Sequence, residues 1–385
     1  MTGESVRSRV EPFHVMDVVA AAARRQRTRG DVVSLAAGQP STRAPRPVLD
    51  AMRRALEENT LGYSETLGLR DLRERIAAYL SRNEDVTIPA DDVVVTTGSS
   101  GAFTLLFLAA FDAGDTVVVA RPGYPAYRNT LAALWCRVIE LDCDASVRFQ
   151  PTVAMLDALP APPAGLIVAS PANPTGTVID PDELAALARW CDEHGTLLIS
   201  DEIYHGITYD GVRCRSARAF SDRAVVVGSV SKYFSMTGWR LGWAVVPPDL
   251  LRAVERLASN MTVCPPTVSQ VAALAAFDDV SIVELDGHVE RYARNREVLL
   301  TGLADLGITR TAPADGAFYV YADLGHLTDD SAAWCAELLD RTGVAVVPGL
   351  DFDTVDGRRS VRLSFAGSTE DMHEALTRVA PHLRR

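Results

Sequence analysis

The sequence predicts an α/β fold in which helices cover a mainly parallel sheet, followed by a smaller α+β part. Strand-length runs rich in valine, isoleucine and leucine alternate with helical segments up to about residue 250, and such alternation is typical of a parallel sheet. These runs are apolar almost without interruption, as expected for strands that are buried on both faces. Beyond them the pattern changes to longer helices and then to short strands, which indicates a second unit of a different class.

The first part is expected to contain a seven-stranded sheet. Its strands are expected at residues 93–97, 116–120, 138–141, 166–170, 197–200, 225–228 and 243–246. Helical patterns lie between them, for example at residues 102–111 and 181–193. Asp180 precedes the second of these helices and Pro181 opens it, which suits an N-cap followed by proline at the first helical position.

The second part is expected to combine helices and strands. Its expected elements are helices at residues 250–258 and 289–306 and strands at residues 318–321 and 361–365. An N-terminal helix at residues 15–25 is expected to pack on them. The chain is therefore expected to divide into an N-terminal arm (1–45), a large domain (46–282) and a small domain (283–385), which should touch closely because no low-complexity linker separates them.

The composition describes a globular chain with a large core, since 48% of its 385 residues are hydrophobic and 23% are charged. A net charge of -12 argues against a nucleic-acid partner, because phosphate binding requires a concentrated basic surface. No apolar stretch approaches the roughly 20 residues that span a bilayer. The six cysteines lack the short paired spacing of a metal site or redox pair. Without a signal-peptide pattern, these features predict a cytoplasmic protein.

Lys232 is the only lysine among the 38 basic residues. Arginine cannot supply a primary amine that loses its proton, so a lysine kept at one position points to amine chemistry. Lys232 follows the expected strand at residues 225–228, with Ser229 and Ser231 just before it and Arg240 eight residues after it. This group of side chains could bind an aldehyde covalently and grip a phosphate.

The segment at residues 229–240 resembles the cofactor-lysine segment of class I/II aminotransferases, which are fold-type I enzymes dependent on pyridoxal 5'-phosphate. The resemblance implies that fold, with Lys232 holding pyridoxal phosphate through a Schiff base. The other matching segments come in the order that this family has, and together they span nearly the whole chain.

The loop at residues 97–102 lies between an expected strand and helix. Its small residues would let backbone N–H groups at the helix N-terminus approach a phosphate, although many strand-to-helix turns have the same composition. The resemblance implies that the cofactor phosphate is bound by Ser99 and Ser100, with Ser229, Ser231 and Arg240 on its other side.

Two polar motifs follow further expected strands. Asp201 and Tyr204 come after residues 197–200, where a buried carboxylate is costly unless it is paired; an aspartate that caps a helix is the alternative. Asn173 lies in a stiff turn rich in proline and glycine after residues 166–170. The resemblance implies that Asp201 pairs with the protonated ring nitrogen, while Tyr204 and Asn173 bind the phenolic oxygen of the ring.

The remaining matches concern the ring face, a partner subunit and the substrate. Tyr124 is implied to stack on the ring, although core packing explains it nearly as well. Tyr63 matches the tyrosine that reaches across a dimer interface to the neighbouring phosphate, which implies a homodimer. The resemblance further implies that the carboxylate of the amino acid is bound by Gly38, Asn173 and Arg362.

The implied reaction transfers an amino group from an L-amino acid to a 2-oxo acid, with Lys232 moving the proton. Three alternatives stay open: a lyase, decarboxylase or cyclising enzyme on the same scaffold, a non-catalytic effector-binding module, and a nucleotide-binding oxidoreductase. The module is disfavoured because no DNA-binding region precedes Gly38. The oxidoreductase is disfavoured because residues 98–101 lack the spaced three-glycine fingerprint.

The sequence defines the side chain of the substrate least. No motif clearly supplies a second cation for a side-chain carboxylate. Phe13, Val15, Met16 and Phe318 could line a pocket for apolar or aromatic groups. We therefore expect the substrate to be a neutral or basic amino acid.

Overall fold

The computed structural model describes residues 3–58, 60–84 and 86–383. The α-helices are α1 (His14–Arg29), α2 (Arg46–Glu58), α3 (Arg70–Glu84), α4 (Gly98–Ala110), α5 (Pro125–Ala133), α6 (Val153–Asp157), α7 (Pro181–His194), α8 (Pro248–Met261), α9 (Thr267–Ala273), α10 (Asp279–Asp305), α11 (Ser331–Thr342) and α12 (Thr369–Leu383). The strands are β1 (Val33–Ser34), β2 (Val93–Thr96), β3 (Thr116–Arg121), β4 (Arg137–Asp142), β5 (Gly165–Ala169), β6 (Leu197–Asp201), β7 (Val225–Ser229), β8 (Gly242–Val245), β9 (Tyr319–Asp323), β10 (Val344–Ala345), β11 (Val347–Pro348) and β12 (Ser360–Ser364).

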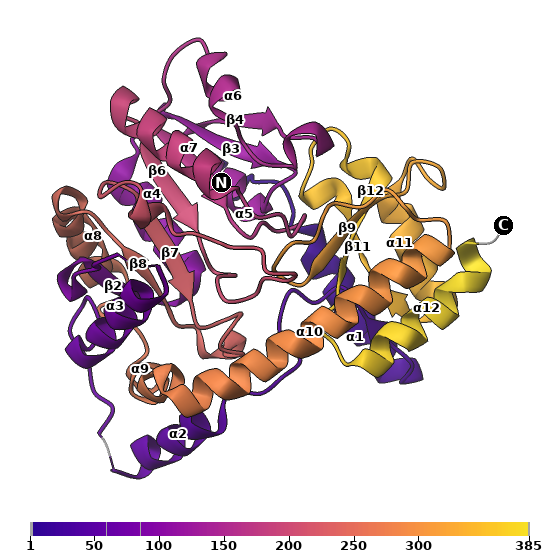
Figure 1. The fold of residues 1–385 in the computed structure, drawn as a ribbon, viewed down its shortest axis with the longest axis horizontal. Helices are drawn as coiled ribbons and strands as arrows, with labels where there is room; N and C mark the ends of the chain where they lie inside the picture. The colour runs from indigo at the N-terminus through magenta and orange to yellow at the C-terminus, as the bar shows by residue number, and fades with distance from the viewer. Residues whose placement is uncertain (1–2, 59, 85, 384–385) are drawn as a thin grey trace.

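A seven-stranded sheet with the order β2-β8-β7-β6-β5-β3-β4 forms the centre of the larger part (Figure 1). Its strands are parallel except β8, which runs antiparallel to both β2 and β7. All seven expected strands are present, and each boundary agrees with its prediction to within one residue. The predicted mainly parallel, seven-stranded sheet is thus confirmed.

Helices cover both faces of this sheet because its strands are apolar on both sides. Val117 and Val119 on β3 point to one face, where they pack with apolar residues of α4, α5 and α8. Val118 points to the other face, where α3 and α7 contribute to the core. The predicted N-cap of α7 is confirmed, because the Asp180 side chain accepts a hydrogen bond from the backbone N–H of Asp182.

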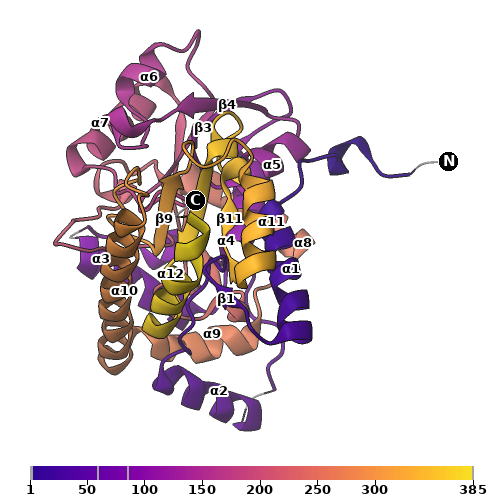
Figure 2. The ribbon, with the colours of Figure 1, turned by 90° about the vertical axis from the view of Figure 1, so that its right-hand side faces the viewer.

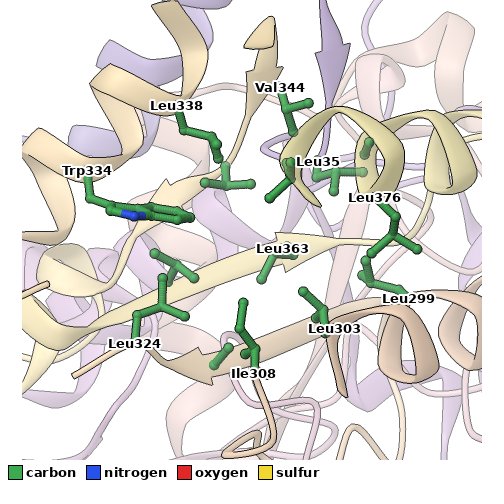
Figure 3. Close-up of a pocket in the computed structure, with 15 residues that line it drawn as sticks. Leu35, Leu299, Leu303, Ile308, Leu324, Trp334, Leu338, Val344, Leu363 and Leu376 are labelled. Carbon is green, nitrogen blue, oxygen red and sulfur yellow. The ribbon is translucent and has the colours of Figure 1, made fainter. Parts of the chain in front are cut away.

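The smaller part contains the antiparallel sheet β11-β12-β9 and the short parallel pair β1-β10. Figure 2 shows α10, α11 and α12 lying beside these strands. Leucine, valine and isoleucine side chains from the helices and strands point toward one another around a residual cavity of about 20 Å³ (Figure 3). This cavity is lined by Trp334 and Leu338 of α11, Leu299 of α10 and Leu363 of β12. These side chains form the apolar core of the smaller part.

The N-terminal arm packs on the smaller part through α1. The Asp351 carboxylate accepts hydrogen bonds from the backbone N–H groups of His14 (2.9 Å) and Val15 (2.6 Å), which satisfies free donors at the start of the helix. The helix ends at Arg29, and the capping residue Gly30 has a left-handed φ of 69°, which suits glycine. Shortly after this turn in the arm, β1 pairs in parallel with β10 of the smaller part.

Helix boundaries differ from the sequence prediction more than strand boundaries do. The helix expected at residues 102–111 begins at Gly98, and the helix expected at 289–306 begins at Asp279. Ser281 and Leu285 are fully buried in the first turns of α10, so packing outweighs the low helix propensity of Gly287. The proposed boundary between residues 282 and 283 therefore lies within a continuous helix, which runs from α9 to the smaller part (Figure 1).

Within the described ranges, no helix is both long and apolar enough to cross a membrane.

Candidate active site

A cavity of about 480 Å³ lies where β5, β6 and β7 end. Its volume is in the range of small-molecule sites. The carboxyl ends of parallel strands meet at one edge of a sheet, and ligands of α/β proteins bind there. The predicted site residues that line it are Gly38, Ser99, Ser100, Tyr124, Asn173, Asp201, Tyr204, Ser231, Lys232, Arg240 and Arg362.

Lys232 lies just after β7, with its side-chain amine inside the cavity. The Nζ atom donates a hydrogen bond to the backbone oxygen of Gly38 at 2.6 Å and lies 5.6 Å from the centre of the Tyr204 ring. Burial, with repulsion from Arg362, lowers the pKa of Lys232 to about 8, although Asp201 opposes the shift. The amine can therefore lose its proton near neutral pH, as a nucleophile or base requires.

Asp201 is the last residue of β6, and it is 3% exposed. Its carboxylate accepts hydrogen bonds from the Tyr127 hydroxyl and from the backbone N–H of Ile203. Burial raises the pKa of Asp201 to about 6, while the Tyr127 hydrogen bond and the nearby Lys232 act in the opposite direction. The group is thus charged at neutral pH in a buried place, where a protonated ring nitrogen is a suitable partner.

The N-terminus of α4 and the Arg240 guanidinium form one wall of the cavity. Gly98 has a φ of +78°, and a Cβ there would lie 2.7 Å from Nη2 of Arg240, so only glycine permits this approach. Ser99 and Ser100 follow in the first turn, whose free N–H groups attract anions. Arg240 itself has a left-handed φ of 51°, and its Nη1 donates to the backbone oxygen of Thr237 at 2.9 Å. This wall suits a phosphate.

Ser229 is placed differently from the other residues expected around the phosphate. Its Oγ accepts a hydrogen bond from the backbone N–H of Ser231 at 3.0 Å and lies 2.8 Å from Oγ of Ser231. Ser231 lines the cavity, whereas Ser229 lies behind it. A contact between Ser229 and the phosphate stays a prediction, and the geometry shows that Ser229 supports Ser231.

Arg362 lies on another wall, where β12 meets the N-terminal arm. Its Nη1 donates to Oδ1 of Asn173 at 3.0 Å, and its Nη2 donates to the backbone oxygen of Ala36 at 2.9 Å. The guanidinium carbon lies 4.4 Å from the ring centre of Tyr319 and 4.9 Å from that of Phe352. An isolated arginine on a strand is usually a surface charge, but Arg362 is 3% exposed and held in place, as two-pronged carboxylate binding requires.

Two tyrosines of the site were missed in the sequence. The Tyr319 hydroxyl lies 2.7 Å from the hydroxyl of Tyr204, and it would be 2.8 Å from a Cβ at Gly38. Tyr127 binds Asp201 from α5. Tyr127 could have been predicted from the sequence, because it lies one helical turn after the predicted site residue Tyr124. Nothing in the sequence around Tyr319 indicates that it lies near the cavity.

The expected side-chain pocket is largely present. Phe13, Val15 and Met16 line the cavity, whereas Phe318 is fully buried behind Tyr204, with the ring centres 5.4 Å apart. Phe318 thus packs against a cavity wall, outside the set of lining residues. Tyr63 is 87% exposed and lies outside the cavity of its own chain, so its expected role across a dimer interface stays a prediction.

These features fit pyridoxal phosphate. A buried amine of lowered pKa can attach to its aldehyde, a buried carboxylate can face its ring nitrogen, and the glycine-lined helix N-terminus can hold its phosphate. The fold and the site together define a lysine-dependent pyridoxal-phosphate enzyme.

Comparisons with known proteins agree with this class. The family model for aminotransferase class I and II matches residues 30–379. The valine–pyruvate aminotransferase of Mycobacterium tuberculosis is 56% identical over 380 residues, which cover 98% of each chain. A crystal structure of an aminotransferase from Mycobacterium tuberculosis has a TM-score of 0.98 at 55% identity, covering 100% of this chain and 99% of the other. For the aspartate aminotransferase from Thermus thermophilus with maleate, the TM-score is 0.94 at 34% identity, covering 99% and 100%.

The chain belongs to the class I and II aminotransferases. It is a transaminase of fold type I that depends on pyridoxal phosphate. The predicted family, fold and cofactor are confirmed, and the lyase, effector-binding and oxidoreductase alternatives are set aside.

Proposed function

We propose that this enzyme transfers the amino group between a neutral amino acid with a branched apolar side chain and a 2-oxo acid, with valine and pyruvate as the first candidates. The observation that carries the proposal is the apolar wall made by Phe13, Val15 and Met16. The name of the valine–pyruvate aminotransferase, with which the chain shares 56% identity, supports the same substrates.

The charges of the cavity support a neutral side chain. Among the described residues that line it, the cationic ones are Lys232, Arg240 and Arg362. Arg240 lies beside the N-terminus of α4 and is proposed to bind the phosphate, while Arg362 is proposed to bind the carboxylate that every amino acid carries. Neither is left for a side-chain carboxylate. A basic side chain would need an acidic partner, but Asp201, the acidic lining residue, is proposed to face the ring.

The roles of the other residues follow from their positions. When bound, pyridoxal phosphate supplies an electron sink that weakens the bonds at the amino acid's Cα. Arg362, oriented by Asn173, holds the substrate carboxylate, and the backbone of Gly38 closes that side. The amine of Lys232, with its pKa near 8, is the base that would take the proton from Cα and move it within the site. Asp201 would hold the proton on the ring nitrogen, and Tyr204 would donate a hydrogen bond to the phenolic oxygen of the ring.

Absorbance of the purified holoenzyme tests the substrate proposal. Valine added without an oxo acid should convert the visible cofactor band to the shorter-wavelength amine form and release the matching 2-oxo acid, and pyruvate should restore the band. Aspartate and arginine at equal concentrations serve as controls and should react at least about tenfold more slowly, because a charged side chain in an apolar pocket is unpaired. A faster reaction with either would contradict the proposal.

A further inference from the structure

A cluster of titratable side chains surrounds His205, outside the active-site cavity. The Sγ atom of Cys214 lies 3.1 Å from Nε2 of His205. On the other side of the imidazole, Nδ1 lies 3.4 Å from Oε1 of Glu84 and 3.6 Å from Oε2 of Glu202. The thiol, imidazole and carboxylates are thus arranged as nucleophile, base and orienting groups. The His205 side chain is 15% exposed, and Cys214 is partly exposed, so the pair is not sealed inside the core.

Backbone donors fix the two carboxylates so that each presents one oxygen to His205. Oε2 of Glu84 accepts from the backbone N–H of Ser216 at 2.7 Å, with Nε of Arg215 at 3.4 Å. Oε1 of Glu202 accepts from the backbone N–H of Ala217 at 2.9 Å. Oε2 of Glu202 has no hydrogen-bond partner within the described residues, and it is the atom that faces the imidazole.

The imidazole is therefore suited to hold a proton. Burial alone lowers the pKa of His205, but attraction to Cys214 and Glu202, together with hydrogen bonds to Cys214 and Glu84, outweighs it and raises that pKa well above its ordinary value.

The surroundings of Cys214 accommodate the sulfur both with and without its proton. The neutral thiol can donate to the backbone oxygen of Ser170, at 3.4 Å. The thiolate can accept from His205 and from the Ser170 hydroxyl, whose Oγ is 3.6 Å away. That hydroxyl is free to donate, because its oxygen already accepts from the backbone N–H of Ile179. Burial raises the pKa of the thiols of Cys136, Cys143, Cys191 and Cys335, which makes these four buried cysteines poor nucleophiles.

The pair is connected to the active site on two sides. Ser170, in contact with Cys214, is followed by Pro171 and Asn173, which line the cavity, and Asn173 orients Arg362. His205 directly follows Tyr204, which lines the cavity as well. A group attached to Cys214 would press on both segments and shift the residues proposed to bind the substrate carboxylate.

We propose that Cys214 is a modification site for low-molecular-weight disulfides, and that the resulting mixed disulfide weakens amino-acid binding. The one proton that the thiol and Nε2 of His205 share passes first from the sulfur to the imidazole. The thiolate sulfur then attacks one sulfur of R–S–S–R, so that a Cys214–S–S–R bond forms while the original S–S bond breaks. The departing R–S⁻ takes the proton held by His205 and leaves as a thiol. The cysteine is oxidised and one R–S group is reduced, and no other oxidant is needed. The effect on binding rests on the proposed function, whereas disulfide formation does not.

Oxidised glutathione is a suitable probe of the holoenzyme. Peptide mass mapping should find the first glutathione on Cys214, attached at least about tenfold faster than on Cys264, because the imidazole 3.1 Å from the Cys214 sulfur can take its proton. Cys264 is also partly exposed and serves as an internal reference without any substitution. The modified enzyme should show a KM for valine raised about tenfold, since small displacements of positioning residues are costly, with a smaller change in kcat. Dithiothreitol should restore the KM.

Three variants separate the parts of the proposal. His205→Gln keeps the size of the side chain but removes the proton acceptor, so labelling of Cys214 should slow about tenfold. Cys214→Ser should keep its KM in oxidised glutathione, and Cys264→Ser should respond like the wild type. Faster labelling of Cys264, or unchanged labelling of Cys214 in His205→Gln, would overturn the site. Labelled Cys214 with an unchanged KM would overturn its effect on binding. Failure of the unmodified enzyme to use valine would defeat only the proposed substrate.

Discussion

Lys232 can be followed without background, because no other lysine competes for the cofactor. Borohydride reduction of the holoenzyme should leave one pyridoxyl group, and peptide mapping should place it on Lys232. Burial lowers the pKa of this amine from 10.5 to about 8, so the rate of cofactor attachment to the apoenzyme should increase with pH up to about 8 and then level off. The reason is that only the unprotonated amine attacks the aldehyde.

Lys232→Arg is the matched control for this experiment, because it keeps the positive charge but has no amine that can lose its proton. Its peptide should carry no label, and its turnover should be abolished. A pyridoxyl group elsewhere in the wild type, or sustained turnover by the variant, would show that the lysine assignment is wrong.

Tyr127 is expected to help keep Asp201 charged. Burial raises the pKa of Asp201 to about 6 even with the Tyr127 hydrogen bond in place, so Tyr127→Phe should raise it further. Since Asp201 is proposed to act in its charged form, the acid limb of kcat/KM should move to higher pH. A hydrogen bond to a charged group contributes about 1.5 to 3 kcal/mol, which corresponds to a displacement of about one pH unit or more. The pH dependence of initial rates measures it.

Tyr209→Phe provides the comparison, because it also removes a buried tyrosine hydroxyl, one that donates to the backbone oxygen of Ala317 at 2.5 Å. Its acid limb should stay at the wild-type pH. If the limb of Tyr127→Phe also stayed there, other groups would determine the charge of Asp201.

Site residues that follow strand ends could be predicted from the sequence, and residues brought in by packing could not. Asp201, Asn173 and Lys232 each come just after an apolar run, and parallel strands bring such positions to one edge. Tyr319 reaches the cavity because β9 belongs to a second sheet that packs beside the first. Its position depends on contacts between elements that are distant in the sequence, which no local pattern records.

At the scale of elements, the same distinction separates strands from helices. The buried strands are short apolar runs, most of which are bounded by polar residues or glycine, so their limits can be read directly. The helices begin where capping and tertiary contacts decide. The helix α4 starts at Gly98, four residues before the first residue of its apolar pattern, and this extra turn is the part that lines the active-site cavity beside Arg240.

Packing of α10 in the core of the smaller part allows a stability prediction. Leu299 is fully buried beside a cavity of only about 20 Å³ (Figure 3). Leu299→Ala should lower the free energy of unfolding by about 2 to 5 kcal/mol, because the lost methyl groups leave a new cavity in a dense core. Urea unfolding followed by circular dichroism measures the change.

Val283→Ala on the same helix is the control, because this side chain is 73% exposed. Its unfolding free energy should stay within about 0.5 kcal/mol of the wild type. If the two substitutions lowered the free energy of unfolding equally, burial of the Leu299 side chain in the core would not stabilise the fold.

At the scale of the whole molecule, the exposure of Tyr63 leads to a prediction about dimer formation. Its side chain is 87% exposed in the single chain, and we propose that it binds the phosphate in a partner subunit. The protein should elute at twice the mass of one chain. Tyr63→Phe should weaken cofactor binding about tenfold or more, because a hydrogen bond to a charged phosphate contributes about 1.5 to 3 kcal/mol. A monomer with full activity would contradict this proposal.

Hybrid dimers test directly whether Tyr63 acts on its own chain or on the partner. When Lys232→Ala and Tyr63→Phe chains are combined, the hybrid has a single site with a lysine, in the Tyr63→Phe chain. If Tyr63 acts across the interface, this site receives the intact tyrosine of the Lys232→Ala chain, and its visible cofactor band should titrate with wild-type affinity. If Tyr63 acts within its own chain, the band should titrate as weakly as in the Tyr63→Phe homodimer. Cofactor affinity thus distinguishes the two arrangements, because only the first restores a complete site from two defective chains.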